Sequence, residues 1–382
     1  MNSSYLDYNA TAPLRPEARA ALLAALEAPA NPSSVHRFGR NARGIADIAR
    51  GQVAELVQAE ARRVVFTSGG TEANNLALRL ALDAAGVKSL VIAGIEHDSV
   101  LRPARHAGLP VYEVVASPDG VVSLAALEAT LGVAQAAHPG PALVALMLAN
   151  NETGAIQPVA EAARLAHAAG ALLLCDAVQA AGKIPVDLSQ LDADFLTLSA
   201  HKLGGPTGVG ALITRDDWTP APLLRGGGQE KGMRAGTENL SGIAGFGAAA
   251  AAAQQGLYGM KSVAALRDRL QAGLRAACPD APVYGTGPKD AGRRLPNTLC
   301  IGMPGVPAET QVMALDLAGV AVSAGSACSS GKVTPSHVLT AMGLPEQAAR
   351  EAIRFSLGWA SSPEDVDRAI DAWSRLWQRK QK

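Results

Sequence analysis

The segment Ser199–Gly210 reads Ser-Ala-His-Lys-Leu-Gly-Gly-Pro-Thr-Gly-Val-Gly and follows the apolar run Phe195–Leu198. The run predicts a buried strand, and the glycines predict a loop whose backbone a bulky ligand can approach. Lys202 lies where the strand ends and the loop begins. A lysine that is neutral and rigidly held at such a point can form an imine with a carbonyl compound. Taken alone, an exposed loop lysine is the more common case.

A carboxylate ends another apolar run upstream. Ala171–Cys175 is followed directly by Asp176 and, three residues later, by Gln179. A buried carboxylate is costly unless a cation meets it, and a protonated pyridine nitrogen is such a cation. Lysine and aspartate in these two roles are the pairing that holds pyridoxal phosphate. The alternative is that Asp176 caps the next helix. Because Asp176 and Lys202 both lie at strand ends of one alternating sheet, a cofactor site is favoured.

A phosphate site would complete such a pocket. Val64–Thr67 predicts a strand, Ser68–Thr71 a turn, and Glu72–Leu78 the start of a helix. The amides of Gly70 and Thr71, together with the Thr71 hydroxyl, would then face an anion at the helix N terminus. Ordinary helix caps look similar, so this turn gains weight only beside the lysine and the aspartate.

Apolar strands alternate with alanine-rich helical patterns from about residue 16 to residue 256, which predicts an α/β fold with a mainly parallel sheet covered on both faces. The strand candidates are Val64–Thr67, Ser89–Ala93, Val111–Val115, Leu143–Leu148, Ala171–Cys175, Phe195–Leu198 and Val209–Ile213. Ligands of such sheets gather at the carboxyl ends of the strands. One pocket is therefore expected to collect the polar residues that follow these strands, namely Thr71, His97, Asn151, Asp176 and Lys202.

The pattern changes near residue 260. A helix is predicted over Ser262–Ala277, strands near Asn297–Ile301 and Ala321–Ser323, and a C-terminal helix from Pro363. This change predicts a second, smaller domain, for which 382 residues leave ample room.

Charge and targeting signals exclude several classes of partner. The 34 Lys and Arg residues balance 34 Asp and Glu residues, which argues against nucleic acid or an anionic membrane as partner. The first residues lack the pattern of a secretion signal, and the apolar runs are too short to span a membrane. A cytoplasmic protein is the simplest expectation.

The four cysteines are far apart, which argues against a zinc site or a disulfide scaffold, and no metal is predicted. Cys175 and Cys300 lie in apolar runs and are expected to be buried, and Cys278 ends a helix in a structural role. Cys328 differs because glycine, serine and alanine surround it. Such a setting is typical of an exposed thiol that can act as a nucleophile.

A series of short blocks, all in the same order, resembles bacterial cysteine desulfurases, which belong to the class V aminotransferase-type family of pyridoxal phosphate enzymes. The blocks are Tyr5–Pro13, Asn31–His36, Phe66–Glu72, Glu96–His97, Asn150–Gly154, Asp176–Gln179, Ser199–Lys202, Gly232–Thr237 and Gly325–Cys328. The resemblance implies a fold type I enzyme with a large domain over residues 16–259. Residues 1–15 and 260–382 would form the small domain with the cysteine loop. The sequence around Cys328 fits the long-loop type that serves iron–sulfur cluster biogenesis.

The resemblance also implies roles for individual residues. Lys202 would bind pyridoxal 5'-phosphate and move protons, Asp176 would pair with the ring nitrogen, Gln179 with the ring hydroxyl, and His97 would stack on the ring. The phosphate ligands would be Gly70, Thr71, Ser199 and His201, with Thr237 reaching the phosphate of a partner subunit in a homodimer. Asn151 and Arg354 would bind the substrate carboxylate. The charge of Arg354 needs a partner, because it lies between the apolar residues Ile353 and Phe355.

The implied reaction converts L-cysteine to L-alanine and leaves the sulfur on Cys328 as a persulfide for an acceptor or iron–sulfur scaffold protein. A selenocysteine lyase or an aminotransferase of the same fold is the alternative, and it predicts that Cys328 is dispensable. A third interpretation is a sulfur-relay or scaffold protein without catalysis, which would bind no cofactor. The chain ends 24 residues after Gly358, which leaves the docking of a scaffold open.

Overall fold

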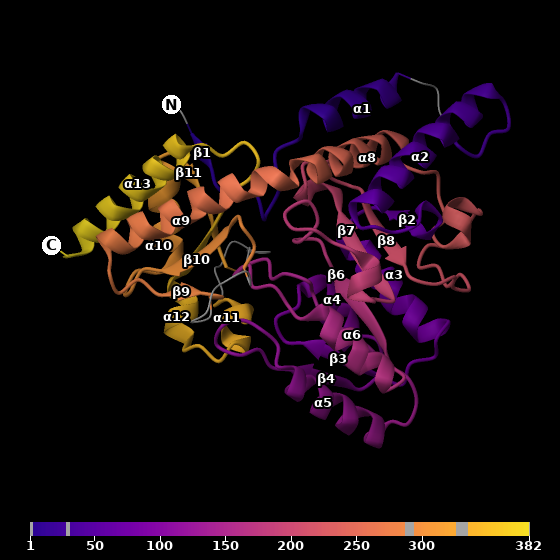
Figure 1. Cartoon of the computed structure of the whole chain (residues 1–382), viewed down its shortest axis with the longest axis horizontal. Helices are drawn as coiled ribbons and strands as arrows, with labels where there is room; N and C mark the ends of the chain where they lie inside the picture. The colour runs from indigo at the N-terminus through magenta and orange to yellow at the C-terminus, as the bar shows by residue number, and fades with distance from the viewer. Residues whose placement is uncertain (1–2, 28–30, 287–293, 326–334, 382) are drawn as a thin grey trace.

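A seven-stranded sheet forms the centre of the larger part of the molecule in this computed structural model, which describes residues 3–27, 31–286, 294–325 and 335–381 (Figure 1). The strands lie in the order β2-β8-β7-β6-β5-β3-β4. Their bounds are β2 Val64–Thr67, β3 Ser89–Ala93, β4 Val111–Val114, β5 Ala142–Ala145, β6 Leu172–Asp176, β7 Phe195–Ser199 and β8 Gly210–Thr214. Each expected strand is present, and the expected α/β class with a mainly parallel sheet is confirmed. Only β8 runs antiparallel to its neighbours, β2 and β7.

Strand β5 ends earlier than the apolar run predicted, at Ala145 rather than Leu148. Beyond Ala145 the chain stays extended, because the amides of Leu146 and Leu148 donate to the carbonyls of Leu174 and Asp176. After Ala145 the chain no longer pairs with β3, its neighbour on the other side. The apolar run therefore stays paired with β6 alone. This pairing places the polar residues that follow the run near the carboxyl end of β6.

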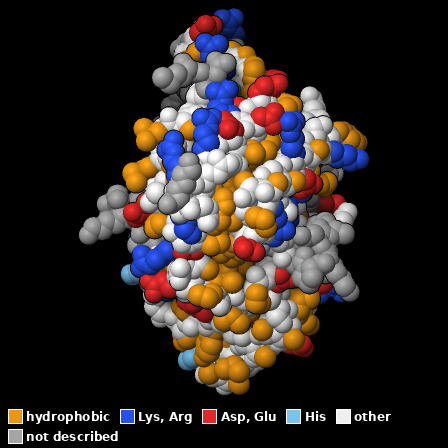
Figure 2. Space-filling view, turned by 90° about the vertical axis from the view of Figure 1, so that its left-hand side faces the viewer, with side chains coloured by type: hydrophobic (Ala, Val, Ile, Leu, Met, Phe, Trp, Pro, Cys, Tyr) orange, Lys and Arg blue, Asp and Glu red, His pale blue; other side chains and the backbone are white. Residues whose placement is uncertain are grey.

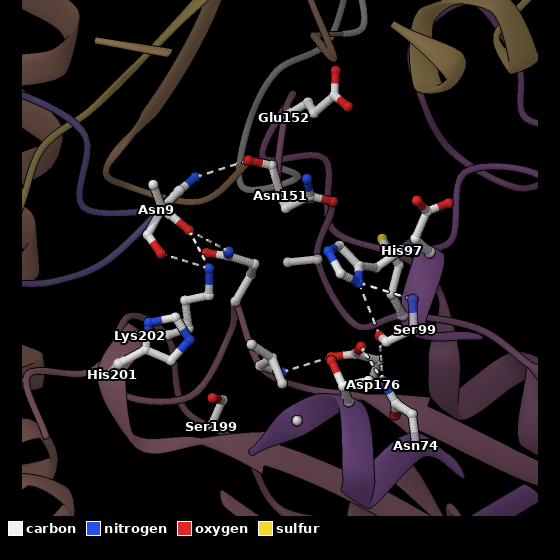
Figure 3. Close-up of a pocket in the computed structure, with 18 of the residues that line it drawn as sticks. Asn9, Asn74, His97, Ser99, Asn151, Glu152, Asp176, Ser199, His201 and Lys202 are labelled. Carbon is white, nitrogen blue, oxygen red and sulfur yellow. Dashed lines mark hydrogen bonds between the residues drawn. The ribbon is translucent and has the colours of Figure 1, made fainter. Parts of the chain in front are cut away.

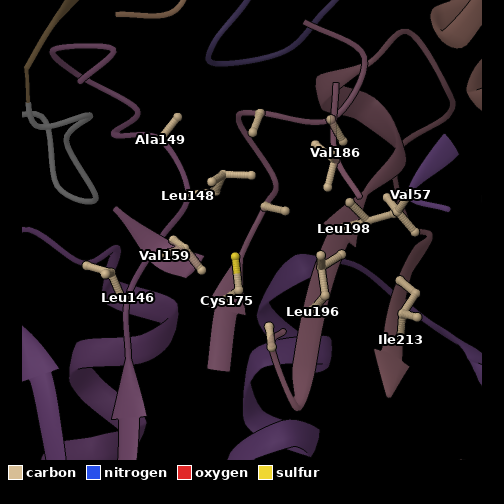
Figure 4. Close-up of a cluster of buried hydrophobic side chains, with 14 of the residues drawn as sticks. Val57, Leu146, Leu148, Ala149, Val159, Cys175, Val186, Leu196, Leu198 and Ile213 are labelled. Atoms are coloured by element: carbon tan, nitrogen blue, oxygen red, sulfur yellow. The ribbon is translucent and has the colours of Figure 1, made fainter. Parts of the chain in front are cut away.

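Helices cover both faces of the sheet, which explains why its central strands are mostly apolar, whereas the edge strand β4 contains the exposed Glu113. On one face lie α2 (Arg37–Leu56), α5 (Leu124–Ala137), α6 (Val159–Ala168) and α8 (Leu240–Gln255), with α1 (Pro16–Leu26) packed against α8. On the other lie α3 (Gly70–Asp83) and α4 (Asp98–Arg105). Alternate residues of β6 divide between the faces: Leu174 packs with α3 and α4, and Cys175 with the opposite cluster, among Leu148, Val159 and Leu196 (Figure 4).

The smaller part contains a four-stranded antiparallel sheet in the order β12-β13-β10-β9. Its strands are β9 (Val283–Tyr284), β10 (Thr298–Gly302), β12 (Ser323–Ala324) and β13 (Ala352–Ser356), and the short parallel pair β1 (Ser4–Tyr5) and β11 (Val320–Ala321) lies beside them. The helices of this part are α9 (Met260–Ala277), α10 (Ala308–Leu317), α11 (His337–Ala341), α12 (Glu346–Glu351) and α13 (Pro363–Gln381). Leu6 and the fully buried Trp373 share one hydrophobic cluster here, which ties the N-terminal strand to the C-terminal helix.

The surface over α10 and α13 carries charged side chains of both signs, dispersed among hydrophobic ones (Figure 2). This mixture agrees with the balanced composition. Among the described residues, every helix is too short or too polar to span a bilayer. Cys175, Cys278 and Cys300 are buried and unbridged, as expected for small core residues.

Candidate functional site

A cavity of about 380 Å³ lies where the carboxyl ends of β5, β6 and β7 meet the smaller part of the molecule (Figure 3). Most of the residues singled out from the sequence line it: Gly70, Thr71, His97, Asn151, Asp176, Gln179, Ser199, His201, Lys202 and Arg354. They come from segments far apart in the sequence. The open α/β sheet brings them together because its strand ends share one edge.

Lys202 ends the short 3₁₀ helix Ala200–Lys202, directly after β7. Its Nζ donates hydrogen bonds of 2.8 Å to the backbone carbonyls of Asn9 and Ala10. Burial, and then the positive charge of Arg354, lower the pKa of the amine to about 8, although the carboxylates of Asp7 and Asp176 act in the opposite direction. An amine with this pKa is neutral far more often at physiological pH than an ordinary lysine. It meets the requirement for an imine-forming residue.

Asp176 is the last residue of β6, and its buried carboxylate lines the cavity. Oδ1 accepts a 3.0 Å hydrogen bond from the amide of Val178, so part of the carboxylate does serve the local turn, as the alternative interpretation proposed. Oδ2 accepts a 2.9 Å bond from Asn74 Nδ2. None of the ion pairs found among the described residues includes Asp176. A cationic ring nitrogen in the cavity would supply the missing charge.

Asn74 and Ser99 are site residues that the sequence analysis missed. The Thr197 hydroxyl donates to Asn74 Oδ1 at 2.7 Å, so the amide nitrogen must face Asp176 and Ser99. Asn74 lies one helical turn after Gly70 in α3, and this spacing places both residues on the same face of the helix. That spacing was the available signal for Asn74.

His97 precedes α4 as its N-cap, and its ring extends into the cavity (Figure 3). Its Nδ1 accepts a 3.0 Å hydrogen bond from the amide of Ser99. A backbone amide can only donate, so Nδ1 carries the lone pair and Nε2 the proton. Burial is the main cause that lowers the pKa of this imidazole. His97 is therefore a neutral ring with a proton available at Nε2.

The start of α3 offers an anion site. No side chain caps this helix, so the amides of Gly70 and Thr71 point toward the cavity without a side-chain acceptor. Ser199 and His201 line the cavity nearby. Burial, and then the charge of Lys202, lower the pKa of His201 to about 4, so this ring is neutral and can donate one hydrogen bond. Backbone amides, hydroxyls and a neutral imidazole are suited to a phosphate group.

Arg354, in the middle of β13, is buried beside Asn151. Its guanidinium donates to Asp7 Oδ1 at 2.7 Å and to the carbonyl of Asn151 at 3.0 Å. Arg354 was expected to find its partner in the substrate, and in the structure it pairs with Asp7 from the N-terminal segment. Arg354 Nε and Asn151 Oδ1 are buried and have no hydrogen-bond partner within the described residues. These two atoms keep polar capacity for a ligand in the cavity.

Two predicted site residues are not found in this cavity. Thr237 is exposed and does not line it, and the loop before it is held against α3 by a 3.0 Å ion pair between Arg234 and Glu72. Cys328 lies outside the described residues. Gly325 and His337 are among the residues that line the cavity.

The fold and the cavity agree with known proteins over nearly the whole chain. The model of the aminotransferase class-V family matches residues 4–369. A protein described as a cysteine desulfurase from Cereibacter sphaeroides is 46% identical over 378 residues, which cover 97% of this chain and 95% of the relative. The structure of a NifS-like protein from Rickettsia africae superposes with a TM-score of 0.88 at 33% identity and covers 99% of this chain and 100% of its own.

A second solved structure, described as SspA in complex with cysteine, has a TM-score of 0.75 at 28% identity and covers 93% of this chain and 99% of its own. Both the sequence and the structural relatives thus extend over the large and the small parts together. The chain belongs to the class-V aminotransferase family and, within that family, to the cysteine desulfurases.

Proposed function

We propose that this protein uses pyridoxal 5'-phosphate to convert L-cysteine to L-alanine and transfers the sulfur to its own Cys328. The observation that carries the proposal is the Lys202 amine, with a pKa of about 8, in the same cavity as the Asp176 carboxylate, which has no cationic partner among the described ion pairs. The similar structure described as a complex with cysteine supports L-cysteine as the substrate.

The residues present fit the cofactor. Lys202 would hold it covalently, Asp176 would face its ring nitrogen, and the uncapped start of α3 would receive its phosphate. The remaining contacts would come from His97, Asn151, Gln179, Ser199 and His201. When bound, pyridoxal phosphate supplies an electron sink for the bonds at the substrate Cα and Cβ.

The chain's own groups would orient the substrate and move its protons. Arg354 Nε has no hydrogen-bond partner among the described residues and can donate to a carboxylate, whereas the unpaired Asn151 Oδ1 can only accept, so Asn151 would use its Nδ2 for that contact. Lys202, once free, would take and return the α-proton, since its pKa lies close to the working pH. His97, whose Nε2 carries a proton, would act as a second proton donor in the same cavity.

The sulfur transfer is balanced. The Cβ–S bond of L-cysteine breaks, an S–S bond forms between the substrate sulfur and Cys328 Sγ, and the remaining three-carbon fragment leaves as L-alanine. The proton of the Cys328 thiol takes the place of sulfur on Cβ, and the proton of the substrate thiol stays on the outer sulfur of the persulfide, so no outside oxidant or reductant is needed. The assignment of Cys328 rests on its sequence setting between small residues.

The proposal includes a homodimer in which Thr237 reaches the phosphate site of the partner subunit. The exposure of Thr237, away from the cavity of its own chain, supports this arrangement. Residues 16–259 would act as the cofactor domain, and residues 1–15 with 260–382 as the small domain with the cysteine loop. The sulfur would pass to an acceptor or iron–sulfur scaffold protein. Buried, unbridged cysteines favour the cytoplasm as the location.

The test compares the purified protein with its Cys328→Ala variant. Both are supplied with L-cysteine and a thiol reductant, and alanine, sulfide and bound cofactor are measured. The proposal predicts equal amounts of alanine and sulfide from the parent, and a variant that keeps the cofactor but releases almost none of either. Full activity in the variant would favour a lyase or an aminotransferase. A parent that binds no cofactor would favour a non-catalytic relay protein.

A further inference from the structure

We propose that Lys183 is a positioning residue that holds the Gln179 side-chain amide and thereby fixes which atom of that amide serves the cofactor. The inference rests on the proposed function, because it concerns how this chain holds pyridoxal 5'-phosphate. Lys183 does not line the main cavity. It lies behind it, beside a void of about 20 Å³ that also contacts Lys202 and Asn297.

The contacts of the Gln179 amide define its orientation. Lys183 Nζ donates to Gln179 Oε1 at 2.7 Å, and Gln179 Nε2 donates to the carbonyl of Asn9 at 2.9 Å. A backbone carbonyl can only accept, so the amide atom that faces the Asn9 carbonyl is Nε2 and the atom that faces Lys183 is Oε1, which accepts. Both ends of the amide are thus assigned. Nε2 keeps a second N–H, and Gln179 lines the cavity, so this side chain presents a donor to the cofactor.

Lys183 also contacts the residue that holds the catalytic lysine. Its Nζ donates to Asn9 Oδ1 at 2.9 Å, and the carbonyl of Asn9 accepts from Gln179. The same carbonyl accepts from Lys202 (Figure 3). Asn9 Oδ1 has a second donor in Asn297 Nδ2 at 3.0 Å. Gln179 Oε1 accepts a hydrogen bond from no other side chain among the described residues. Loss of Lys183 therefore affects Gln179 more than Asn9.

A purely structural role does not account for Lys183. The side chain is buried, and it forms no ion pair with the carboxylates of the described residues. Burial lowers the pKa of this amine well below its usual value, and the nearby cations Lys202 and Arg354 lower it further. A buried lysine without a carboxylate costs stability. Its two hydrogen bonds both go to amides that serve the cavity, and they give the position a functional reason.

The consequence is a measurable change in the bound cofactor. A hydrogen bond donated to the ring oxygen favours its ionised form and lowers the pH at which the bound cofactor titrates. Lys183→Met keeps the length of the side chain but leaves Gln179 Oε1 without a donor, so the amide is held at one end only, by the bond from Nε2 to the Asn9 carbonyl, and loses its fixed position. We expect the visible absorption band to titrate about one pH unit higher than in the parent. We also expect binding of pyridoxal 5'-phosphate to weaken about ten-fold.

The experiment is a double-mutant cycle on the full chain with Lys183→Met, Gln179→Met and both together, read by pH titration of the visible band and by cofactor affinity. If Lys183 acts through Gln179, each single variant shifts the titration upward and the double variant shifts it no further. The matched control is Lys261→Met, which removes an exposed lysine and should change neither reading.

An unchanged titration and affinity in Lys183→Met overturns the inference, as do shifts that add in the double variant. If Lys183→Met does not fold by circular dichroism, Lys183→Leu, which likewise has no donor, gives the same comparison, and an unchanged titration there also overturns the inference. Failure of the proposed function is a separate result: the parent itself would take up no cofactor.

Discussion

Lys202 and Glu96 are buried ionisable residues whose pKa values move in opposite directions for one reason, because burial disfavours the charged form of each. For Lys202, whose pKa is lowered to about 8, the reactive neutral amine appears at lower pH than in an ordinary lysine. We expect the rate at which cofactor-free protein attaches pyridoxal 5'-phosphate to rise with pH and reach half its maximum near pH 8. Borohydride trapping and peptide mass at Lys202 measure this rate. A midpoint near 10.5, the usual value, would contradict the environment described for Lys202.

Glu96 lies beside His97, and burial, with the charge of Asp176 as a second cause, raises its pKa to about 8. Its folded pKa is above its unfolded value, so the folded state binds more protons between pH 4.5 and pH 8. Stability should therefore fall as pH rises through this window. Glu96→Gln keeps the shape of the protonated acid and should remove that fall, so that the variant is more stable than the parent by roughly 2 to 4 kcal/mol above pH 8.

Urea unfolding of the parent and of Glu96→Gln at pH 5, 6.5 and 8.5 measures the difference. The gap between the two proteins should widen with pH. A gap that stays constant would show that the Glu96 carboxyl does not change its charge on folding.

The sequence was sufficient to predict site residues that stand at strand ends, such as Lys202 and Asp176. It could not predict Asn9 or Asn74, because their roles depend on contacts across long stretches of chain. Asn74 meets Asp176 across 102 positions, and Asn9 meets Lys202 across 193. No local pattern marks Asn9 for such a contact, and the spacing of Asn74 from Gly70 indicates only that both lie on the same face of α3. Only the folded chain brings these residues together.

At the level of elements, Gly210 at the start of β8 fixes the approach of the phosphate turn. A methyl group at this position would come within 2.5 Å of the carbonyl carbon of Gly69, and 2.7 Å of the carbonyl oxygen of Leu198. Gly210→Ala must therefore displace the turn before α3. We expect cofactor affinity to fall about ten-fold, although none of the residues expected to bind the cofactor is changed. Gly51→Ala is the control, because a methyl group there meets nothing within 4 Å. The measurement is the equilibrium affinity of each variant for pyridoxal 5'-phosphate. Equal affinities of Gly210→Ala and Gly51→Ala would contradict the prediction.

The loop that leads to Thr237 is held by a buried ion pair. Glu230 accepts two 2.7 Å bonds from Arg50 and a 2.9 Å bond from the amide of Phe66, the strand residue next to Thr67 in β2. Glu230 and Lys231 both have positive φ, of 44° and 57°, a backbone conformation that costs free energy in residues with a side chain. Glu230→Ala leaves Arg50 buried without its partner. We expect the free energy of unfolding to fall by about 3 to 5 kcal/mol.

Glu60→Ala is the comparison for this loss, since Glu60 pairs with Arg62 on the exposed surface. It should leave the denaturation midpoint unchanged. If the two variants lose the same stability in urea, the Arg50–Glu230 pair does not hold the loop as described.

Elements differ in how far their sequence predicts them. The long apolar strands of the large sheet were predicted within a few residues, because burial on both faces leaves a continuous apolar run. The two-residue strand β1 was not predicted, because so short a segment has no period of its own, whereas β11 overlaps the strand expected near Ala321–Ser323. They form through pairing with each other across the chain.

At the level of the whole molecule, the exposed Thr237 gives the proposed homodimer a direct test. Thr237→Ala and Lys202→Ala chains are prepared separately and then mixed under conditions that exchange subunits. In a mixed dimer, one site combines an intact Lys202 with an intact Thr237 from the partner chain. Tight cofactor binding should therefore return on mixing. If each chain supplied its own Thr237, or if Thr237 played no part, mixing would restore nothing.

The central claim is that the cavity around Lys202 transfers the sulfur of L-cysteine to Cys328, and a single-turnover experiment without reductant tests it most directly. The holoenzyme is mixed with L-cysteine, and the mass of the peptide that contains Cys328 is measured together with the alanine formed. We predict that this peptide gains one sulfur atom for each alanine released. Alanine without sulfur on Cys328, or no alanine from a protein loaded with cofactor, would contradict the account.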